Sequence, residues 1–129
     1  MKEFNTDILI VGSGLVGLVA ANCLSALNYR VTLVDKKSFS NSESSFRDTR
    51  TVAVSEGSKV FLESLNLWSF LKTYAEPIKN INVYDRSSHN KIIFSNEKEN
   101  EKLGYVIENK KFSKILINQL KKFKNTKVH

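Results

Sequence analysis

The segment from Asp7 to Asp35 constrains the fold more than any other part of this 129-residue chain. Residues 7–11 form a short apolar run rich in β-branched side chains, which is typical of a strand buried on both faces of a parallel sheet. The sequence Gly-Ser-Gly-Leu-Val-Gly follows at 12–17, and the helix-compatible residues up to 27 are small or apolar. A second apolar run at 31–34 ends at Asp35. The pattern predicts a strand–helix–strand unit with a right-handed crossover.

The glycine turn, residues 12–17, has the spacing G-x-G-x-x-G between a strand and a helix, which is the context in which this spacing binds a dinucleotide. The first glycine permits the tight turn, the second lets the backbone approach a pyrophosphate, and the third lets the helix and strand pack closely. These are Gly12, Gly14 and Gly17. The helix N-terminus behind them offers N–H groups to the anion. Asp35, at the end of the second strand, is the acid expected to bind ribose hydroxyls.

Taken alone, the glycine turn leaves the choice between NAD and FAD open, because both cofactors present an adenosine diphosphate to it. A P-loop is excluded, because Gly17 is followed by Leu18 and Val19 instead of Lys and Ser/Thr. Ser13 lacks the flanking pattern of a nucleophile elbow, and no His and Asp set is placed to complete a triad. We therefore assign no catalytic residue.

After Asp35 the pattern changes to shorter elements. Residues 38–49 are polar and serine-rich, which predicts a loop. Ser55 is expected to cap a helix that begins at Glu56, and Asn66 to divide that apolar run into two helices. The remaining expected elements are strands at 81–85, 91–95 and 103–107, a helix at 110–124 and the start of a strand at 127.

The net charge of +7 is local, because residues 110–129 contain seven lysines and no acid. Such a patch attracts phosphate, nucleic acid or anionic lipid, but the solvated face of an ordinary amphipathic helix has the same composition, and we favour that interpretation.

Cys23 is the only cysteine, so we expect neither an internal disulfide nor a metal site. The chain lacks a signal-peptide pattern and a long apolar run, so we expect a cytoplasmic protein.

Several segments, taken in order, resemble a known family. Residues 7–35 resemble the FAD-binding fingerprint of the glutathione-reductase-like flavoproteins. The later segments resemble the ubiquinone-biosynthesis hydroxylases of the octaprenyl-methoxyphenol hydroxylase type, which are aromatic monooxygenases with the p-hydroxybenzoate hydroxylase fold; these segments are 50–55, 65–68, 77–83 and 104–109. The resemblance covers nearly the whole chain. It departs at Asn28, where the family has glycine, although Asn also tolerates a left-handed turn.

The resemblance implies FAD as the cofactor and gives roles to individual residues. The N–H groups of Leu15 and Val16 would bind the pyrophosphate with the three glycines, and Lys36 would lie at the rim of the adenosine site beside Asp35. Arg50 matches an arginine on the flavin side of the cofactor. Asn109 matches an amide that contacts FAD at the start of a helix, and it is equally suited to be the N-cap of that helix.

The expected fold class is α/β: a Rossmann-like FAD-binding βαβ unit with helices and the start of an antiparallel substrate-domain sheet. Residues 1–77 would form the FAD-binding part and 78–107 the beginning of the substrate-domain sheet. Residues 108–129 would supply a helix and a strand start that return to the FAD domain. The family's later Asp-Gly and Gly-Asp segments lie beyond His129, so we expect a truncated chain that is inactive alone.

The function implied by the resemblance is the FAD-binding N-terminal portion of a monooxygenase that hydroxylates a prenylated phenol in ubiquinone biosynthesis with NAD(P)H and O2. It is compatible with peripheral contact between the complete enzyme and the inner membrane, and with a ubiquinone-synthesis complex. Nucleic acid is not an expected partner. Two alternatives stay open. A NAD-dependent dehydrogenase half predicts further βαβ units after Asp35, and a basic nucleotide-binding module predicts exposed aromatic residues among the lysines of 110–127.

Overall fold

The computed structural model describes residues 5–36, 49–85, 87, 90–95 and 101–129. By spatial contacts the chain divides into two units, the first made of residues 1–50 and 109–129 and the second of residues 51–108. The predicted division at 77 and 107 concerns which parts bind FAD and substrate, and it stays a prediction. Most of the loop predicted at 38–49 lies outside the described residues.

The first unit contains the predicted strand–helix–strand motif. The prediction that its first strand is buried on both faces is wrong, because this strand is at the edge of the sheet and its Leu9 and Val11 side chains are 57% and 79% exposed. Its sheet has the order β1-β2-β8, and both pairs of neighbouring strands are parallel. Ile8 pairs with Val31, and Val31 pairs with Thr126, so the predicted start of a strand near residue 127 is confirmed. The elements are β1 (Ile8–Val11), α1 (Leu15–Ala26), β2 (Val31–Val34), α4 (Asn109–Leu120) and β8 (Thr126–Val128).

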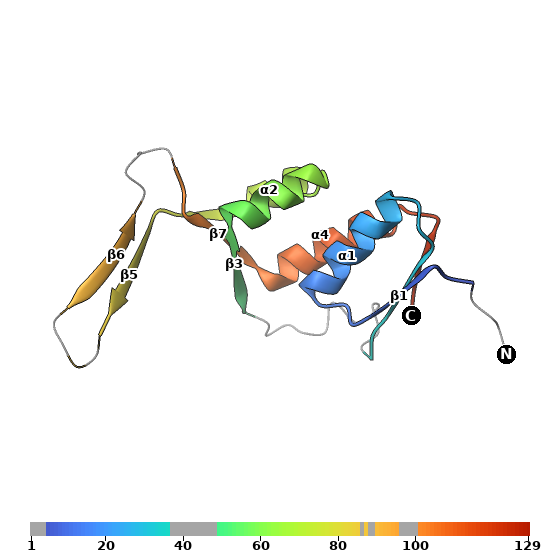
Figure 1. Cartoon of the computed structure of the whole chain (residues 1–129), viewed down its shortest axis with the longest axis horizontal. Helices are drawn as coiled ribbons and strands as arrows, with labels where there is room; N and C mark the ends of the chain where they lie inside the picture. The colour runs from blue at the N-terminus through green and yellow to red at the C-terminus, as the bar shows by residue number, and fades with distance from the viewer. Residues whose placement is uncertain (1–4, 37–48, 86, 88–89, 96–100) are drawn as a thin grey trace. The chain divides into compact units, whose positions relative to one another are not determined.

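Helices α1 and α4 lie side by side (Figure 1), and their contact forms much of the first unit's core. The completely or almost completely buried apolar side chains there come from α1, β2 and α4: Leu18, Ala21, Val31, Leu33, Leu116 and Leu120. Asn22 is the polar member of this core. Its Nδ2 donates hydrogen bonds to the Leu18 carbonyl at 2.8 Å and the Leu116 carbonyl at 3.1 Å. A buried amide that joins two helices in this way favours one register between them.

The ends of the two helices differ in how well the sequence predicts them. Asn28 has a φ of 67° just after the end of α1, so the expectation that it adopts a left-handed turn in place of glycine is confirmed. The helix predicted over 110–124 is wrong at its end, because α4 stops at Leu120. The amide of Phe123 donates to the Leu120 carbonyl at 3.1 Å, which is a tighter turn than an α-helix makes. This turn lets the chain reverse into β8.

The second unit is built mainly from antiparallel strands. Strand β7 pairs with β3 on one side and with β4 on the other, while β5 and β6 form a separate hairpin. The predicted hairpin is confirmed, and β3 is an element that the sequence analysis did not assign. The elements are β3 (Thr51–Ser55), α2 (Glu56–Ser64), α3 (Trp68–Leu71), a 3-10 turn (Lys72–Tyr74), β4 (Glu76–Ile78), β5 (Asn80–Tyr84), β6 (Lys91–Ser95) and β7 (Gly104–Glu108).

Local sequence explains the helices of the second unit. The Ser55 hydroxyl oxygen accepts a hydrogen bond from the Ser58 amide at 3.2 Å, so the predicted N-cap of α2 is confirmed. Asn66 has a φ of 56° and separates α2 from α3, as predicted. Trp68 is buried, and its ring meets the Tyr105 ring edge-on with centroids 5.0 Å apart. Within the described part of the chain, no helix is long and apolar enough to cross a membrane.

Candidate dinucleotide-binding site

The glycine turn connects β1 to α1 and is closely packed at its third glycine. The Gly12 amide donates to the Val34 carbonyl at 2.8 Å, which continues the pairing of β1 with β2 into the turn. A Cβ added to Gly17 would lie 2.1 Å from the Gly12 carbonyl oxygen. A side chain at Gly17 therefore requires the backbone to move, as expected for the glycine that lets a helix and a strand approach closely.

The second glycine has open space beside it. Gly14 is the N-cap of α1, and a Cβ added there would meet nothing within 4 Å. No side chain caps this helix, and its first turn contains no acidic residue. The first N–H groups of an α-helix have no acceptor inside the helix, and the dipole makes this end positive. The open turn and uncapped N-terminus fit the pyrophosphate of a dinucleotide, and the first-turn residues Leu15 and Val16 are the ones predicted to donate.

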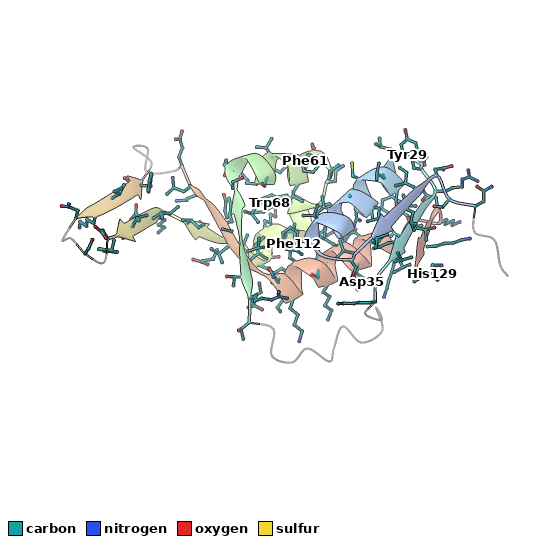
Figure 2. The ribbon with its side chains drawn as sticks, turned by 60° about the horizontal axis from the view of Figure 1, so that its bottom comes forward. Tyr29, Asp35, Phe61, Trp68, Phe112 and His129 are labelled. Carbon is teal, nitrogen blue, oxygen red and sulfur yellow. The ribbon has the colours of Figure 1, made fainter. Side chains whose placement is uncertain are left out.

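Asp35 lies beside the glycine turn, at the carboxyl end of β2. Its Oδ2 accepts hydrogen bonds from the Ser13 amide and from the Ser13 hydroxyl, both at 2.6 Å. The Asp35 amide donates to the His129 carbonyl at 2.9 Å, so its backbone is also held by the chain that follows β8 (Figure 2). Lys36 follows Asp35 and is exposed. The predicted ribose-binding acid and the predicted pyrophosphate-binding turn are thus brought together.

Arg50 and Asn109 form a second pair of predicted site residues. The Asn109 amide donates to the Arg50 carbonyl at 3.0 Å, so the residue before β3 is joined to the first residue of α4. Arg50 is exposed and Asn109 is half-buried. The side-chain oxygen of Asn109 is buried and has no hydrogen-bond partner among the described residues. No hydrogen bond between described residues links Asn109 to the glycine turn.

The unpartnered amide oxygen of Asn109 is relevant to cofactor binding because buried polar atoms are rarely left without a partner. A bound cofactor that donates a hydrogen bond would satisfy this oxygen. The open space at Gly14 and this buried acceptor are compatible with a dinucleotide such as FAD, and the side-chain oxygen of Asn22, in the core between α1 and α4, is also buried without a partner among the described residues. Among the described residues, no three or more His, Cys, Asp or Glu side chains are grouped so that they could hold a metal ion.

Sequence reasoning missed the contact between Ser13 and Asp35. Ser13 occupies a variable position of the glycine motif, and the sequence analysis considered it only as a nucleophile. It also missed the bond from Asn22 to α4, because an Asn in the middle of an amphipathic helix gives no sign of its partner. The only usable signal for Ser13 was its hydroxyl group, placed next to the predicted binding turn.

The lysines of 110–127 are all exposed in the structure: Lys110, Lys111, Lys114, Lys121, Lys122, Lys124 and Lys127. Phe112, which lies among them in the sequence, is 4% exposed and belongs to the core. Phe123 is half-buried. The basic surface is therefore formed by lysines without a platform of exposed aromatic rings.

Comparison with known proteins extends these observations. A family model described as FAD dependent oxidoreductase matches residues 7–109. Ubiquinone hydroxylase UbiL of Rhodospirillum rubrum is 27% identical over 114 residues, covering 88% of this chain and 27% of that protein. The mitochondrial ubiquinone biosynthesis monooxygenase COQ6 of Dictyostelium discoideum is 26% identical over 140 aligned residues, covering 96% of this chain and 28% of that protein. The chain thus spans about a quarter of the length of these curated relatives.

A solved structure gives the same fold. The p-nitrophenol 4-monooxygenase PnpA from Pseudomonas putida superimposes with a TM-score of 0.77 and 17% identity, over 100% of this chain and 32% of that chain. At this identity the likeness concerns the fold alone.

The family match covers most of the chain, including the glycine turn, Asp35 and Asn109. The chain belongs to the FAD-dependent oxidoreductase family, whose cofactor is FAD.

Proposed function

We propose that the chain is the FAD-binding N-terminal portion of a flavin-dependent monooxygenase that hydroxylates a prenylated phenol in ubiquinone biosynthesis, using NAD(P)H and O2. The observation that carries this proposal is the pair of curated relatives, which are both ubiquinone enzymes by name and align with 88% and 96% of the chain. The fold agrees, because a structural neighbour that covers the whole chain is an aromatic monooxygenase.

The residues of the first unit would bind the ADP half of FAD. Helix α1 would direct its first N–H groups to the pyrophosphate, with Gly14 leaving room for the phosphates to approach the backbone. Asp35 would accept hydrogen bonds from the adenosine ribose hydroxyls, with Lys36 at the rim of the site. The residues that contact the pyrophosphate are proposed to be Gly12, Gly14, Leu15, Val16 and Gly17.

Arg50 and Asn109 are proposed to contact the flavin side of the cofactor. The support for Asn109 is its buried side-chain oxygen, which has no partner among the described residues and would accept a hydrogen bond from FAD. Bound FAD supplies the redox chemistry between NAD(P)H and O2. The chain itself contributes the binding and orientation of the cofactor, and we assign no catalytic residue in it.

The domain assignment is part of the proposal. Residues 1–77 and 108–129 would serve FAD binding, and 78–107 would begin the substrate-domain sheet, although 51–77 pack in the same unit as 78–108. The β5–β6 hairpin has one apolar face that is exposed, which supports the proposal that it belongs to a larger sheet. The side chains of this face are Ile81, Val83, Ile92 and Phe94. A two-stranded hairpin is marginally stable alone in water, so such a face is expected where further strands or layers complete the sheet.

The two alternative functions receive less support. A NAD-dependent dehydrogenase half predicts that βαβ units continue after Asp35, whereas β3, β4 and β7 are antiparallel. A nucleic-acid or surface-binding module predicts exposed rings among the lysines, whereas Phe112 is buried.

Cofactor binding is the direct test of the proposal. The 129-residue chain would be titrated with FAD in a calorimeter, with FMN, which lacks the ADP half, as the control ligand. We expect FAD to bind more tightly than FMN, because the described contacts concern the ADP half. Equal binding of FAD and FMN, or no binding of FAD, would contradict the proposed site.

The substrate assignment needs a different experiment. Disruption of the gene in its host should reduce ubiquinone and cause a prenylated phenol that lacks one hydroxyl group to accumulate, as measured by mass spectrometry of lipid extracts. A matched strain that carries the gene with the Asp35→Ala change separates the role of this chain from effects on neighbouring genes. Normal ubiquinone in the disrupted strain would refute the substrate assignment and leave FAD binding unaffected.

A further inference from the structure

Ser13 makes two hydrogen bonds to one oxygen of Asp35. The backbone amide and the side-chain hydroxyl each lie 2.6 Å from Asp35 Oδ2. A hydroxyl–carboxylate distance in this range is typical of a charge-assisted hydrogen bond, which is stronger than one between neutral groups. Both side chains are half-buried. Any residue except proline has a backbone amide at position 13, but only Ser and a few other residues supply the second donor.

The position of Ser13 follows from the strand register. Val11 pairs with Val34 in the parallel sheet, so Asp35 lies one residue beyond this pair on β2 and Ser13 two residues beyond it on β1. The neighbours of Ser13 in the turn are Gly12 and Gly14, which have no side chains. The Ser13 hydroxyl is therefore the only side-chain donor that residues 12–14 can direct to the carboxylate.

A carboxylate held in this way is better prepared to bind a ligand. An Asp side chain has two rotatable dihedral angles, and fixing a side chain when a ligand binds costs conformational entropy. Two donors that already hold Oδ2 fix the carboxylate before the ligand arrives. A carboxylate has about four lone-pair sites, so the two hydrogen bonds from Ser13 do not by themselves prevent it from accepting a ribose hydroxyl.

We propose that Ser13 is a positioning residue for the adenosine ribose of the cofactor, acting through Asp35. The inference rests on the proposed function, because it assumes that Asp35 binds the ribose. Ser13 itself need not contact the ligand. It determines the orientation in which Asp35 accepts the ribose hydroxyls, and so adds affinity and selectivity for a nucleotide with those hydroxyls.

The test compares two ligands on the complete 129-residue chain. ADP carries both ribose hydroxyls, and 2′,3′-dideoxy-ADP carries neither. We expect Ser13→Ala to weaken ADP binding about twofold to tenfold, as measured by calorimetry, which corresponds to the cost of fixing one side chain. Binding of the dideoxy nucleotide should not change. Ser13→Thr keeps a hydroxyl group and should bind ADP like the unchanged chain.

A double-mutant cycle shows whether Ser13 acts through Asp35. In an Asp35→Ala background, the Ser13→Ala change should have no further effect on ADP binding. Equal losses for ADP and the dideoxy nucleotide would mean that Ser13 shapes the turn and does not position the acid, which overturns the inference. Unchanged or tighter ADP binding by Ser13→Ala would also overturn it, since the hydroxyl would then be idle or compete with the ribose.

These outcomes differ from failure of the proposed function. If the unchanged chain binds neither FAD nor ADP, the site assignment fails and the role of Ser13 fails with it. If the unchanged chain binds both, and only the Ser13 comparison gives a contradictory result, the FAD site stands and the positioning role alone is refuted.

Discussion

The second and third glycines of the turn are expected to respond in opposite ways to the same change, Gly→Ala. At Gly17 the added Cβ would lie 2.1 Å from the Gly12 carbonyl oxygen and 3.6 Å from Ile10 Cγ2. Real Cβ atoms do not approach other atoms closer than 3.0 Å, so the helix and the strand would have to separate. At Gly14 the same atom would meet nothing within 4 Å, and the Gly14 φ of −64° is open to alanine.

The expected magnitudes follow from these contacts. Overpacking against a rigid backbone costs about 3 kcal/mol, and replacing a helical glycine by alanine regains about 1 kcal/mol, so Gly17→Ala should destabilise the chain by roughly 2 kcal/mol. For a chain of this size, such a loss lowers the midpoint of thermal unfolding by roughly 6–10 °C. For Gly14→Ala the lost cap preference and the reduced flexibility of the unfolded chain nearly cancel, which leaves stability within about 0.5 kcal/mol.

Gly14→Ala, which should leave stability nearly unchanged, should strongly reduce the affinity for the cofactor. In the proposed site the added methyl group would occupy the space through which the pyrophosphate approaches the backbone, so Gly14→Ala should weaken FAD binding at least about tenfold, or about 1.4 kcal/mol. Circular dichroism during heating and calorimetric titration with FAD measure the two effects separately. An unchanged unfolding midpoint for Gly17→Ala would refute the close packing at the third glycine. Unchanged FAD affinity of a folded Gly14→Ala chain would refute the placement of the pyrophosphate.

Three further predictions concern pH, lipid and catalysis. The Arg30 guanidinium and amide donate hydrogen bonds to the Asp7 carboxylate and lower its pKa from 3.8 to about 2. The stability that this pair contributes should therefore be complete above pH 4 and be lost as the pH falls through 2. The thermal unfolding midpoint of the Asp7→Asn variant should lack this pH dependence. Vesicles of anionic lipid should bind the chain weakly and release it as the salt concentration rises. Changing Lys121, Lys122 and Lys124 to Gln should reduce the amount of protein that sediments with the vesicles. Equal binding at all salt concentrations would contradict an electrostatic attraction. The 129-residue chain alone should not couple NAD(P)H oxidation to phenol hydroxylation, and hydroxylated product in a chromatographic assay would refute that expectation.

The first unit was predictable because its signals are local. Residues 8–11 and 31–34 are apolar runs of strand length, and the glycine turn between them has a fixed relation to the helix. The positions of Asn28 and Asn66 as helix-ending residues were also identified, and the left-handed conformation was expected for Asn28, because few residues other than Asn and Gly adopt it. These features depend on a few neighbouring residues, so a single sequence contains them.

The missed elements depend on partners far away in the chain. Residues 51–55 alternate in burial, with Val52 and Val54 on the inner side, so the period of a strand was present in the sequence. It was overlooked because five residues give a weak pattern until β7 pairs with them. The end of α4 was misplaced for a similar reason: Phe123 continues the apolar spacing of the helix, but the backbone leaves the helix at Leu120 to reach β8.

The contact between Ser13 and Asp35 adds to the proposed binding site a feature that the glycine motif does not contain. The glycine spacing fixes the backbone of the turn and leaves position 13 variable. The parallel register of β1 with β2 then places this variable side chain beside the acid that ends β2. The Ser13 amide donates one hydrogen bond to this acid, and whether a second donor is present depends on the side chain at this position. Relatives with the same glycines but without a hydroxyl at this position should therefore bind the ADP half with a less constrained carboxylate, and a serine introduced there should increase their preference for ADP over its dideoxy analogue.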